Sequence, residues 1–198
     1  MLTKDQLLEP LAQLRGDAVV VTTMGVVRPW AKYSNSELDF ASADSAMGHA
    51  ADLALGIALA QPERKVICLN GDGSMLMTLG TLVTITGAGA GNLVLIIVQN
   101  GTYEITGNQL IPAAAKVDFV SLARGAGFER VYFSQDAEAY ANSLPEALNG
   151  DGPVLMVVIV EPGSEGPISR GSHEQARYLN PSLAESAHRL RRALRHSR

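Results

Sequence analysis

Residues 66–74, Val-Ile-Cys-Leu-Asn-Gly-Asp-Gly-Ser, decide the fold, because an apolar run typical of a buried strand ends there in a glycine-rich turn. A second apolar run, residues 93–98, is followed by Gln-Asn-Gly-Thr-Tyr at residues 99–103. The segment between the two runs has the length that one helical crossover between parallel strands requires. Ligands bind at the carboxyl ends of the strands in an open parallel sheet. We therefore expect Asp72 and Asn100 to meet at one edge of such a sheet.

Further apolar runs on either side of this stretch extend the predicted sheet. The runs 18–23 and 153–160 are short, rich in β-branched residues and separated from their neighbours by segments of helix length, so they predict strands. Shorter or less apolar strands are expected at 38–40 and 128–133. Helices are expected at 4–14, 26–33, 47–60, 118–126 and 136–148. Strands that are apolar on both faces indicate a parallel sheet with helices on both sides. We predict an α/β fold with about six parallel strands, as one domain over residues 1–198, with a loop or lid at 161–181 and a helix at 182–198.

The bulk composition argues against several classes of function. The formal net charge of −4 gives no general attraction to nucleic acid or to an anionic membrane. No run approaches the ~18 apolar residues of a membrane span, and the charged N-terminus does not resemble a signal peptide, so we expect a cytoplasmic protein. The single cysteine, Cys68, lies in an apolar strand, which predicts a buried thiol and no disulfide framework.

The Gly-Asp-Gly and Asn-Gly sequences have a chemical interpretation when they are taken together. Mg²⁺ prefers about six oxygen ligands and is usually held by one or two carboxylates plus phosphate oxygens. Asp72, the amide oxygen of Asn100 and a nearby carbonyl would supply the protein ligands, and Gly71 and Gly73 would allow close approach. Ser74 begins the next helix, where free N–H groups favour an anion. Either half alone would predict only a turn, but together they favour a metal-bridged diphosphate.

The pair of sequences resembles the cofactor motif of thiamine diphosphate (ThDP)-dependent enzymes. Residues 43–50, Ala-Asp-Ser-Ala-Met-Gly-His-Ala, resemble the Gly-Ser-Met-Gly segment of ThDP-dependent decarboxylases. Residues 102–109 resemble the segment after the metal asparagine in the β subunits of sulfopyruvate decarboxylase and in the matching part of phosphonopyruvate decarboxylase. The resemblance covers roughly residues 15–160 and implies the diphosphate-binding domain of such an enzyme.

The resemblance also implies the roles of individual residues. Asp72, Asn100 and the Thr102 carbonyl would bind Mg²⁺, Met47 would be the apolar wedge that bends the cofactor, and the Ser45 carbonyl would accept from the aminopyrimidine. The full set of implied cofactor contacts is Ser45, Met47, Gly48, Gly71, Gly73, Ser74, Asn100, Thr102 and Tyr103. Three positions depart from the pattern, namely Gln99 in place of an asparagine, Ala46 in place of a serine and Asn108 in place of a glycine. The last two leave the substrate open.

The family activates ThDP with a glutamate that lies in a separate pyrimidine-binding domain. Only one α/β unit is evident here, so we expect a second polypeptide, a pyrimidine-binding subunit of α type, to supply that glutamate. For proton transfer in this chain we single out His49 and Glu104, with Tyr103 and His173 as further candidates. Recognition of a sulfonate or phosphonate would require cations near the cofactor, and the candidates are Arg28, Lys32 and Arg170.

We therefore predict a ThDP- and Mg²⁺-dependent decarboxylase of a small 2-oxo acid such as sulfopyruvate or phosphonopyruvate. A carboligase of the acetolactate synthase type, or a non-catalytic ThDP-binding regulatory subunit, remains an alternative. The β subunits of 2-oxo-acid:ferredoxin oxidoreductases also bind ThDP, but a single cysteine argues against an iron–sulfur site in this chain. The glycine-rich residues 87–91 precede a strand instead of following one, so we interpret them as a helix stop and not as a dinucleotide fingerprint. The basic end of the last helix is expected to be a solvated docking face.

Overall fold

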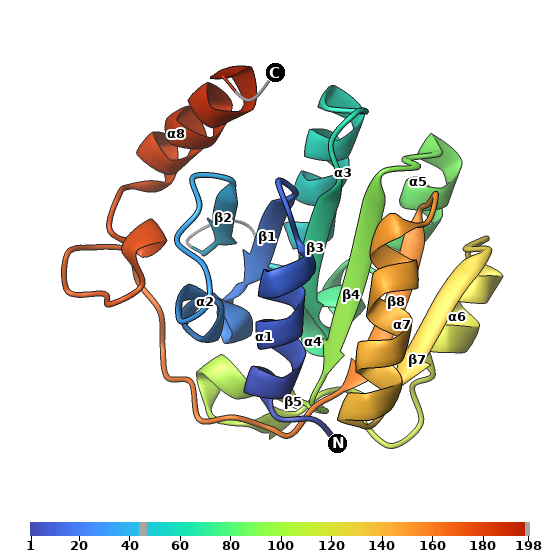
Figure 1. The fold of residues 1–198 in the computed structure, drawn as a ribbon. Helices are drawn as coiled ribbons and strands as arrows, with labels where there is room; N and C mark the ends of the chain where they lie inside the picture. Colours follow the sequence, from blue (N-terminus) through green and yellow to red (C-terminus); the bar gives the residue numbers. More distant parts are fainter. Residues whose placement is uncertain (44–46, 197–198) are drawn as a thin grey trace.

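The computed structural model describes residues 1–43 and 47–196, and its centre is a parallel sheet with helices on both faces (Figure 1). The strand order is β2-β1-β3-β4-β8-β7, and every neighbouring pair in this sheet is parallel. The strands are β1 (Val19–Thr23), β2 (Asp39–Ser42), β3 (Val66–Gly71), β4 (Leu93–Gln99), β7 (Arg130–Ser134) and β8 (Val154–Ile159). The predicted α/β fold with six parallel strands is confirmed.

Helices cover the sheet and connect its strands. They are α1 (Lys4–Leu14), α2 (Met24–Ala31), α3 (Ala50–Ala60), α4 (Asp72–Met77), α5 (Thr81–Ala88), α6 (Phe119–Gly125), α7 (Ala137–Asn149) and α8 (Leu183–His196). Two short 3₁₀ helices, η1 (Glu104–Thr106) and η2 (Arg177–Leu179), and a small antiparallel pair, β5 (Thr102–Tyr103) with β6 (Gln109–Leu110), complete the structure. In Figure 1, α1 and α7 lie in front of the sheet, and the N-terminus lies at the opposite end of the molecule from α8.

The hydrophobic core is divided by the sheet into two layers. Along β3, Val66 and Cys68 pack with α3 and α5 on one face, while Ile67 and Leu69 pack with α1 and α7 on the other. Alternate residues of β4 divide in the same way. In a strand that is covered on both faces, all side chains are buried, which is why these runs are continuously apolar. Burial raises the pKa of the Cys68 thiol, and the predicted buried thiol is confirmed.

Several element boundaries differ from the sequence predictions. The helix expected from residue 47 begins at Ala50, because residues 47–49 form a turn in which Gly48 has φ +87°. The crossover from β3 to β4 contains two short helices, α4 and α5. Gly89 ends α5 in the left-handed conformation (φ +62°), so the predicted helix stop at 87–91 is confirmed. The predicted loop 161–181, which we call the C-terminal strap, contains η2 and leads to α8.

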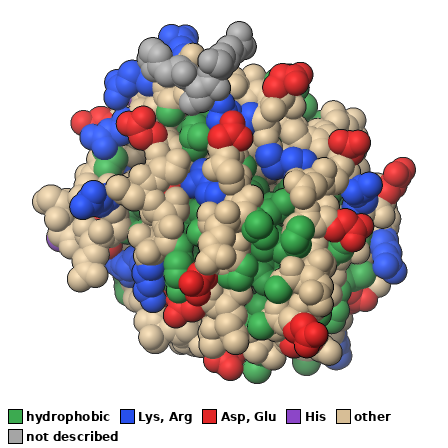
Figure 2. Space-filling model, viewed as in Figure 1, with side chains coloured by type: hydrophobic (Ala, Val, Ile, Leu, Met, Phe, Trp, Pro, Cys, Tyr) green, Lys and Arg blue, Asp and Glu red, His purple; other side chains and the backbone are tan. Residues whose placement is uncertain are grey.

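The surface in the view of Figure 1 carries charges of both signs. Figure 2 shows acidic and basic side chains interspersed over this face, with basic groups more frequent toward α8 at the top. The exposed arginines of α8 are Arg189, Arg191, Arg192 and Arg195, whereas Leu190 and Ala193 are buried against the core. One face of this helix therefore packs on the core while its arginines face solvent. In the described part of the chain, no helix has both the length and the apolar character needed to cross a membrane.

Candidate functional site

A cavity of about 300 Å³ opens at the carboxyl ends of the central strands. Its wall is formed by three junctions, from β1 to α2, from β3 to α4 and from β4 to β5. The cavity therefore lies at the edge of the sheet where the sequence predicted a ligand site. Ten of the residues singled out in the sequence line it: Met47, Gly48, Gly71, Asp72, Gly73, Ser74, Asn100, Thr102, Tyr103 and Glu104. Ser45 lies outside the described residues.

Asp72 is buried at the base of this cavity, with 1% of its surface exposed. Its Oδ1 accepts from the backbone N–H of Gly73 at 2.8 Å, and its Oδ2 accepts from the N–H of Gly101 at 2.7 Å. Burial raises the pKa of Asp72, while these N–H groups act in the opposite direction. No cationic side chain of the described residues pairs with Asp72, so its charge is balanced only by backbone dipoles.

Asn100 follows β4 and lies in the same loop as Gly101. Its Oδ1 accepts from the backbone N–H of Thr102 at 2.9 Å, and its Nδ2 donates to Glu104 Oε2 at 3.0 Å. The Thr102 hydroxyl donates to Asn108 Oδ1 at 2.8 Å. Asn108 has φ +60°, a conformation in which glycine is favoured, so the asparagine that departs from the family pattern keeps the glycine-like backbone.

Two glycines of the cavity are required by side chains that pack on them. A Cβ on Gly73 would lie 2.5 Å from Cε1 of Tyr103, because the tyrosine ring covers this position. A Cβ on Gly48 would lie 2.8 Å from Met77 Cβ, and Gly48 also has a positive φ. At Gly71, by contrast, the nearest atom would be 3.8 Å away, so this backbone is open to the cavity.

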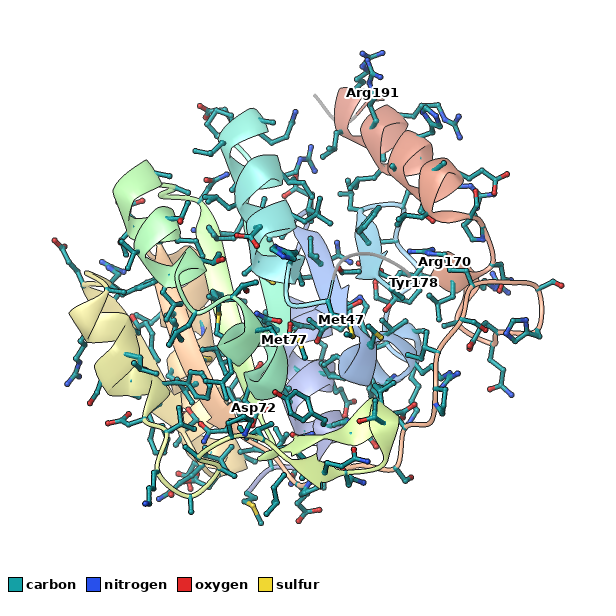
Figure 3. The ribbon with its side chains drawn as sticks, turned by 180° about the vertical axis from the view of Figure 1, so that it is seen from behind. Met47, Asp72, Met77, Arg170, Tyr178 and Arg191 are labelled. Atoms are coloured by element: carbon teal, nitrogen blue, oxygen red, sulfur yellow. The ribbon has the colours of Figure 1, made fainter. Side chains whose placement is uncertain are left out.

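The mouth of the cavity is apolar. Met47 is 62% exposed and Met77 is 47% exposed, although both are large hydrophobic side chains that line the cavity. Figure 3 shows Met47, Met77 and Asp72 on the same side of the molecule, at a distance from Arg191 on α8. Exposed apolar groups beside a cavity indicate a surface that another molecule covers.

The two proton-transfer candidates lie in different environments. Glu104 is 5% exposed and accepts at both of its oxygens, from Lys4 Nζ (2.6 Å) and from Asn100 Nδ2 (3.0 Å). His49 precedes α3, and its Nδ1 is 2.6 Å from Asp52 Oδ2. Its neighbours Gly48 and Ala50 line the cavity, whereas His49 lies beside it with 52% of its side chain exposed. His173 lies on the C-terminal strap, with its Nε2 3.1 Å from Ser169 Oγ.

The cations proposed for anion recognition do not line the cavity. Arg28 holds Glu174 with two hydrogen bonds of 2.9 and 2.7 Å and also donates to two carbonyl groups of the C-terminal strap. Arg170 donates to the carbonyl oxygens of Ala41 and Ala43, just before the segment 44–46, and to Ser186 of α8. Lys32 forms an exposed ion pair with Asp5 at 3.9 Å. Among the described residues that line the cavity, the one cationic side chain is that of Lys4.

The sequence prediction missed one wall of the cavity. Thr23, Met24 and Gly25, at the junction of β1 and α2, line it beside Ser42 at the end of β2. The rule that places ligands at the carboxyl ends of strands applies equally to the run 18–23, so these residues could have been found by extending it to β1. Lys4 had no such signal, because it comes from the first turn of α1.

The residues of the cavity fit a magnesium-bridged diphosphate. Asp72 offers a buried carboxylate, Asn100 an amide oxygen and Thr102 a carbonyl oxygen, all of them oxygen donors that suit a hard cation. Among the described residues, no group of three or more His, Cys, Asp or Glu side chains is arranged so that it could hold a metal ion by itself. One carboxylate with neutral oxygens is the arrangement expected where phosphate oxygens complete the coordination. A buried carboxylate without a cationic partner is otherwise costly.

Two proteins of known activity are similar to this chain. Phosphonopyruvate decarboxylase of Streptomyces viridochromogenes is 37% identical over 166 residues, which cover 81% of this chain and 40% of that protein. The β subunit of sulfopyruvate decarboxylase from Methanothermobacter thermautotrophicus is 35% identical over 165 residues, which cover 83% of this chain and 85% of the subunit. The chain thus spans about two fifths of the first relative and most of the second.

The fold is also similar to that of solved structures. A protein of Mycobacterium smegmatis described as a thiamin diphosphate-dependent enzyme superposes with a TM-score of 0.70 and 25% identity, over 81% of this chain and 32% of that one. The sequence model of the C-terminal TPP-binding domain of thiamine pyrophosphate enzymes, thiamine pyrophosphate being ThDP, matches residues 22–158. The chain therefore belongs to the family of thiamine pyrophosphate enzymes, as their C-terminal TPP-binding domain.

Proposed function

We propose that this chain binds ThDP and Mg²⁺ in the cavity at the carboxyl ends of β1, β3 and β4, as one subunit of a decarboxylase that acts on a small 2-oxo acid. One observation carries the proposal. Asp72 is buried, and in its described contacts its oxygens accept hydrogen bonds from backbone N–H groups only. One of these donors is Gly101, the residue next to Asn100, so the loop that carries Asn100 contacts Asp72 directly. This arrangement supports a divalent cation more directly than any other group of described residues does.

Different residues of the cavity would bind the metal, the diphosphate and the rest of the cofactor. Asp72, Asn100 and the Thr102 carbonyl would hold Mg²⁺, while the backbone at Gly71, Gly73 and Ser74 would face the diphosphate. Met47 and Gly48 would contact the remainder of the cofactor, and the Tyr103 ring would close the cavity over Gly73. When it is bound, ThDP supplies the electron sink that decarboxylation requires. The apolar lining of the cavity would exclude water from the reacting groups.

His49 is the proton-transfer group that we propose for this chain. Its Nδ1 contacts Asp52, whose other oxygen accepts from the Thr81 hydroxyl at 2.7 Å. A histidine that is oriented by a carboxylate at one ring nitrogen presents the other nitrogen for proton exchange. His49 lies next to the cavity-lining Gly48, so Nε2 would serve a substrate that enters past Met47.

We propose that a second polypeptide of α type covers the mouth of the cavity and supplies the activating glutamate. Two observations support a partner at this place. Three large hydrophobic side chains are exposed, namely Met47 in the turn before α3, Met77 on α4 and Val83 on α5. The chain also matches 85% of a protein named as a β subunit. Burying such side chains at an interface would contribute about 1.5–3 kcal/mol for each one fully covered.

The substrate that we propose is a doubly anionic 2-oxo acid, of the sulfopyruvate or phosphonopyruvate type. The names of the two similar proteins support this class. Arg28 and Arg170 are both engaged in contacts within the chain, so we propose that the partner supplies the cation for the sulfonate or phosphonate group.

The test is an activity assay on the complex of this chain with its co-purified partner. Release of CO₂ from sulfopyruvate and phosphonopyruvate would be compared with release from pyruvate, together with the identity of the product. We expect an aldehyde product and loss of CO₂ release in the Asp72→Ala complex. Formation of a 2-hydroxy-2-methyl-3-oxo acid from pyruvate would favour the carboligase. Full CO₂ release with Asp72→Ala would favour a regulatory subunit.

A further inference from the structure

We propose that Glu104 is a positioning residue that fixes the amide of Asn100 with its oxygen available to the metal, and that Lys4 holds Glu104 in place. This inference rests on the proposed metal site. It concerns a network of side chains that come from the start of α1, the loop after β4 and η1.

An asparagine can bind a cation only through Oδ1, but its amide has two orientations of nearly equal shape. Glu104 removes this ambiguity, because its carboxylate is paired with Lys4 and accepts hydrogen bonds at both oxygens. Its Oε2 accepts from Asn100 Nδ2 at 3.0 Å, which directs Oδ1 to the opposite side of the amide. There Oδ1 accepts from the N–H of Thr102 at 2.9 Å, so two contacts specify the same orientation.

Glu104 is itself held by partners on its other oxygen. Oε1 accepts from Lys4 Nζ at 2.6 Å and from the backbone N–H of Glu165 at 3.0 Å. Lys4 also donates to the carbonyl of Gly25 at 2.9 Å, so the ammonium bridges η1 and the start of α2. The side chains of Lys4 and Glu104 are 13% and 3% exposed, so solvent screens this ion pair only weakly.

The C-terminal strap closes over the same carboxylate. A Cβ on Gly163 would lie 2.3 Å from Glu104 Oε1, which shows how closely the strap backbone approaches. Asn108 Nδ2 donates to the Gly163 carbonyl at 3.0 Å, on the other side of the loop. With both oxygens occupied and the strap above it, Glu104 is better arranged to orient Asn100 than to exchange protons with a substrate.

The test is the affinity for Mn²⁺, measured by electron paramagnetic resonance in the presence of ThDP, on the complex as it purifies. Glu104→Gln keeps the shape of the side chain, but its amide can donate as well as accept, so Asn100 is free to turn over. Outer-shell changes of this kind cost about 10–100-fold in metal affinity, and we expect a loss in that range. At saturating Mg²⁺ we expect kcat to return close to the wild-type value.

Two further variants keep the test independent of folding. In the double variant Asn100→Asp and Glu104→Gln, the amide at position 104 donates to the carboxylate at position 100, so the pair is fixed again with its direction reversed. This variant should bind Mn²⁺ more tightly than Glu104→Gln alone. Lys4→Met releases the anchor of Glu104 and should weaken Mn²⁺ several-fold. Glu146→Gln, on α7, is the matched control: Glu146 also accepts a hydrogen bond, from the Tyr132 hydroxyl at 3.0 Å, and its replacement should leave Mn²⁺ binding unchanged.

The outcomes separate this inference from the function on which it rests. Wild-type Mn²⁺ affinity in Glu104→Gln, with kcat lost at every Mg²⁺ concentration, would overturn the positioning role and return Glu104 to proton transfer. Wild-type affinity with wild-type kcat would overturn the inference and leave the metal site intact. Failure of the unaltered complex to bind Mn²⁺ with ThDP would overturn both.

Discussion

The backbone N–H of Gly101 donates a 2.7 Å hydrogen bond to Oδ2 of Asp72. The loop that carries Asn100 is thereby fastened to Asp72, although the two residues follow different strands. Because Gly71 on β3 pairs with Val98 on β4, the strand register brings the two turns to the same level at the edge of the sheet. The candidate site is therefore organised by the sheet and by backbone hydrogen bonds.

Replacement of Gly73 tests the packing of Tyr103 in the cavity. The new Cβ of Gly73→Ala would lie 2.5 Å from Cε1 of the ring, so the ring must move or the turn must shift. We expect a loss of stability of about 1–3 kcal/mol, measured by urea unfolding, together with weaker ThDP binding. Gly56→Ala is the control. Gly56 lies within α3 with no atom within 4 Å of the new Cβ, so this change should stabilise the chain by about 0.4–1 kcal/mol without affecting ThDP.

Arg170 joins the end of β2 to the C-terminal strap and α8. Arg170→Met would remove the donors to the carbonyl groups of Ala41 and Ala43, which precede the segment 44–46. Leaving such groups unpaired costs about 1–3 kcal/mol, so we expect a lower urea midpoint and weaker ThDP binding. Arg191→Met serves as the comparison, since Arg191 is exposed on α8 and far from the cavity (Figure 3). If both variants behaved alike, Arg170 would have no special part in holding β2.

The contact between Arg28 and Glu174 predicts how the C-terminal strap responds to acid. The hydrogen bond from Arg28 lowers the pKa of Glu174 below its ordinary value of 4.5. A carboxylate with a lowered pKa in the folded state contributes stability above its unfolded pKa, and this stability is lost as the pH falls through the folded pKa. We expect amide exchange in the strap to increase, relative to the sheet, as the pH is lowered below about 4.5. Glu174→Gln should remove most of this pH dependence, and an unchanged profile would contradict the assignment.

Much of the fold could be predicted because its strands carry a strong local signal. The runs 66–69 and 93–98 are apolar on both faces, so they predict buried parallel strands from the sequence alone. Asp72 and Asn100 could be brought together in the same way, since both follow such strands. The start of α3 was less predictable, because Met47 and the small residues after it are compatible with a helix, while Gly48 adopts a positive φ against Met77.

The network around Glu104 could not be predicted from the sequence. Lys4 and Glu104 lie 100 positions apart, and neither belongs to a periodic pattern that indicates a contact. The contacts of Arg28 and Arg170 could not be predicted either. Their charges suggested anion recognition, but Arg28 binds Glu174 of the strap and Arg170 donates to a carbonyl group of β2. Such contacts depend on the path of the C-terminal strap, which has little local structure of its own. Positions of single charged side chains are therefore where the structure adds most.

Native mass spectrometry of the purified complex tests most directly whether Asp72 holds a metal-bridged ThDP. We expect a complex with a second polypeptide that retains the combined mass of ThDP and Mg²⁺. We also expect loss of that mass in Asp72→Asn, with affinity reduced about 100-fold or more, because loss of a direct ligand should exceed the effect of an outer-shell change. Asp136→Asn, at the N-cap of α7, should retain the cofactor. Retention of ThDP and Mg²⁺ by Asp72→Asn at the wild-type level would contradict the role of Asp72 as a metal ligand.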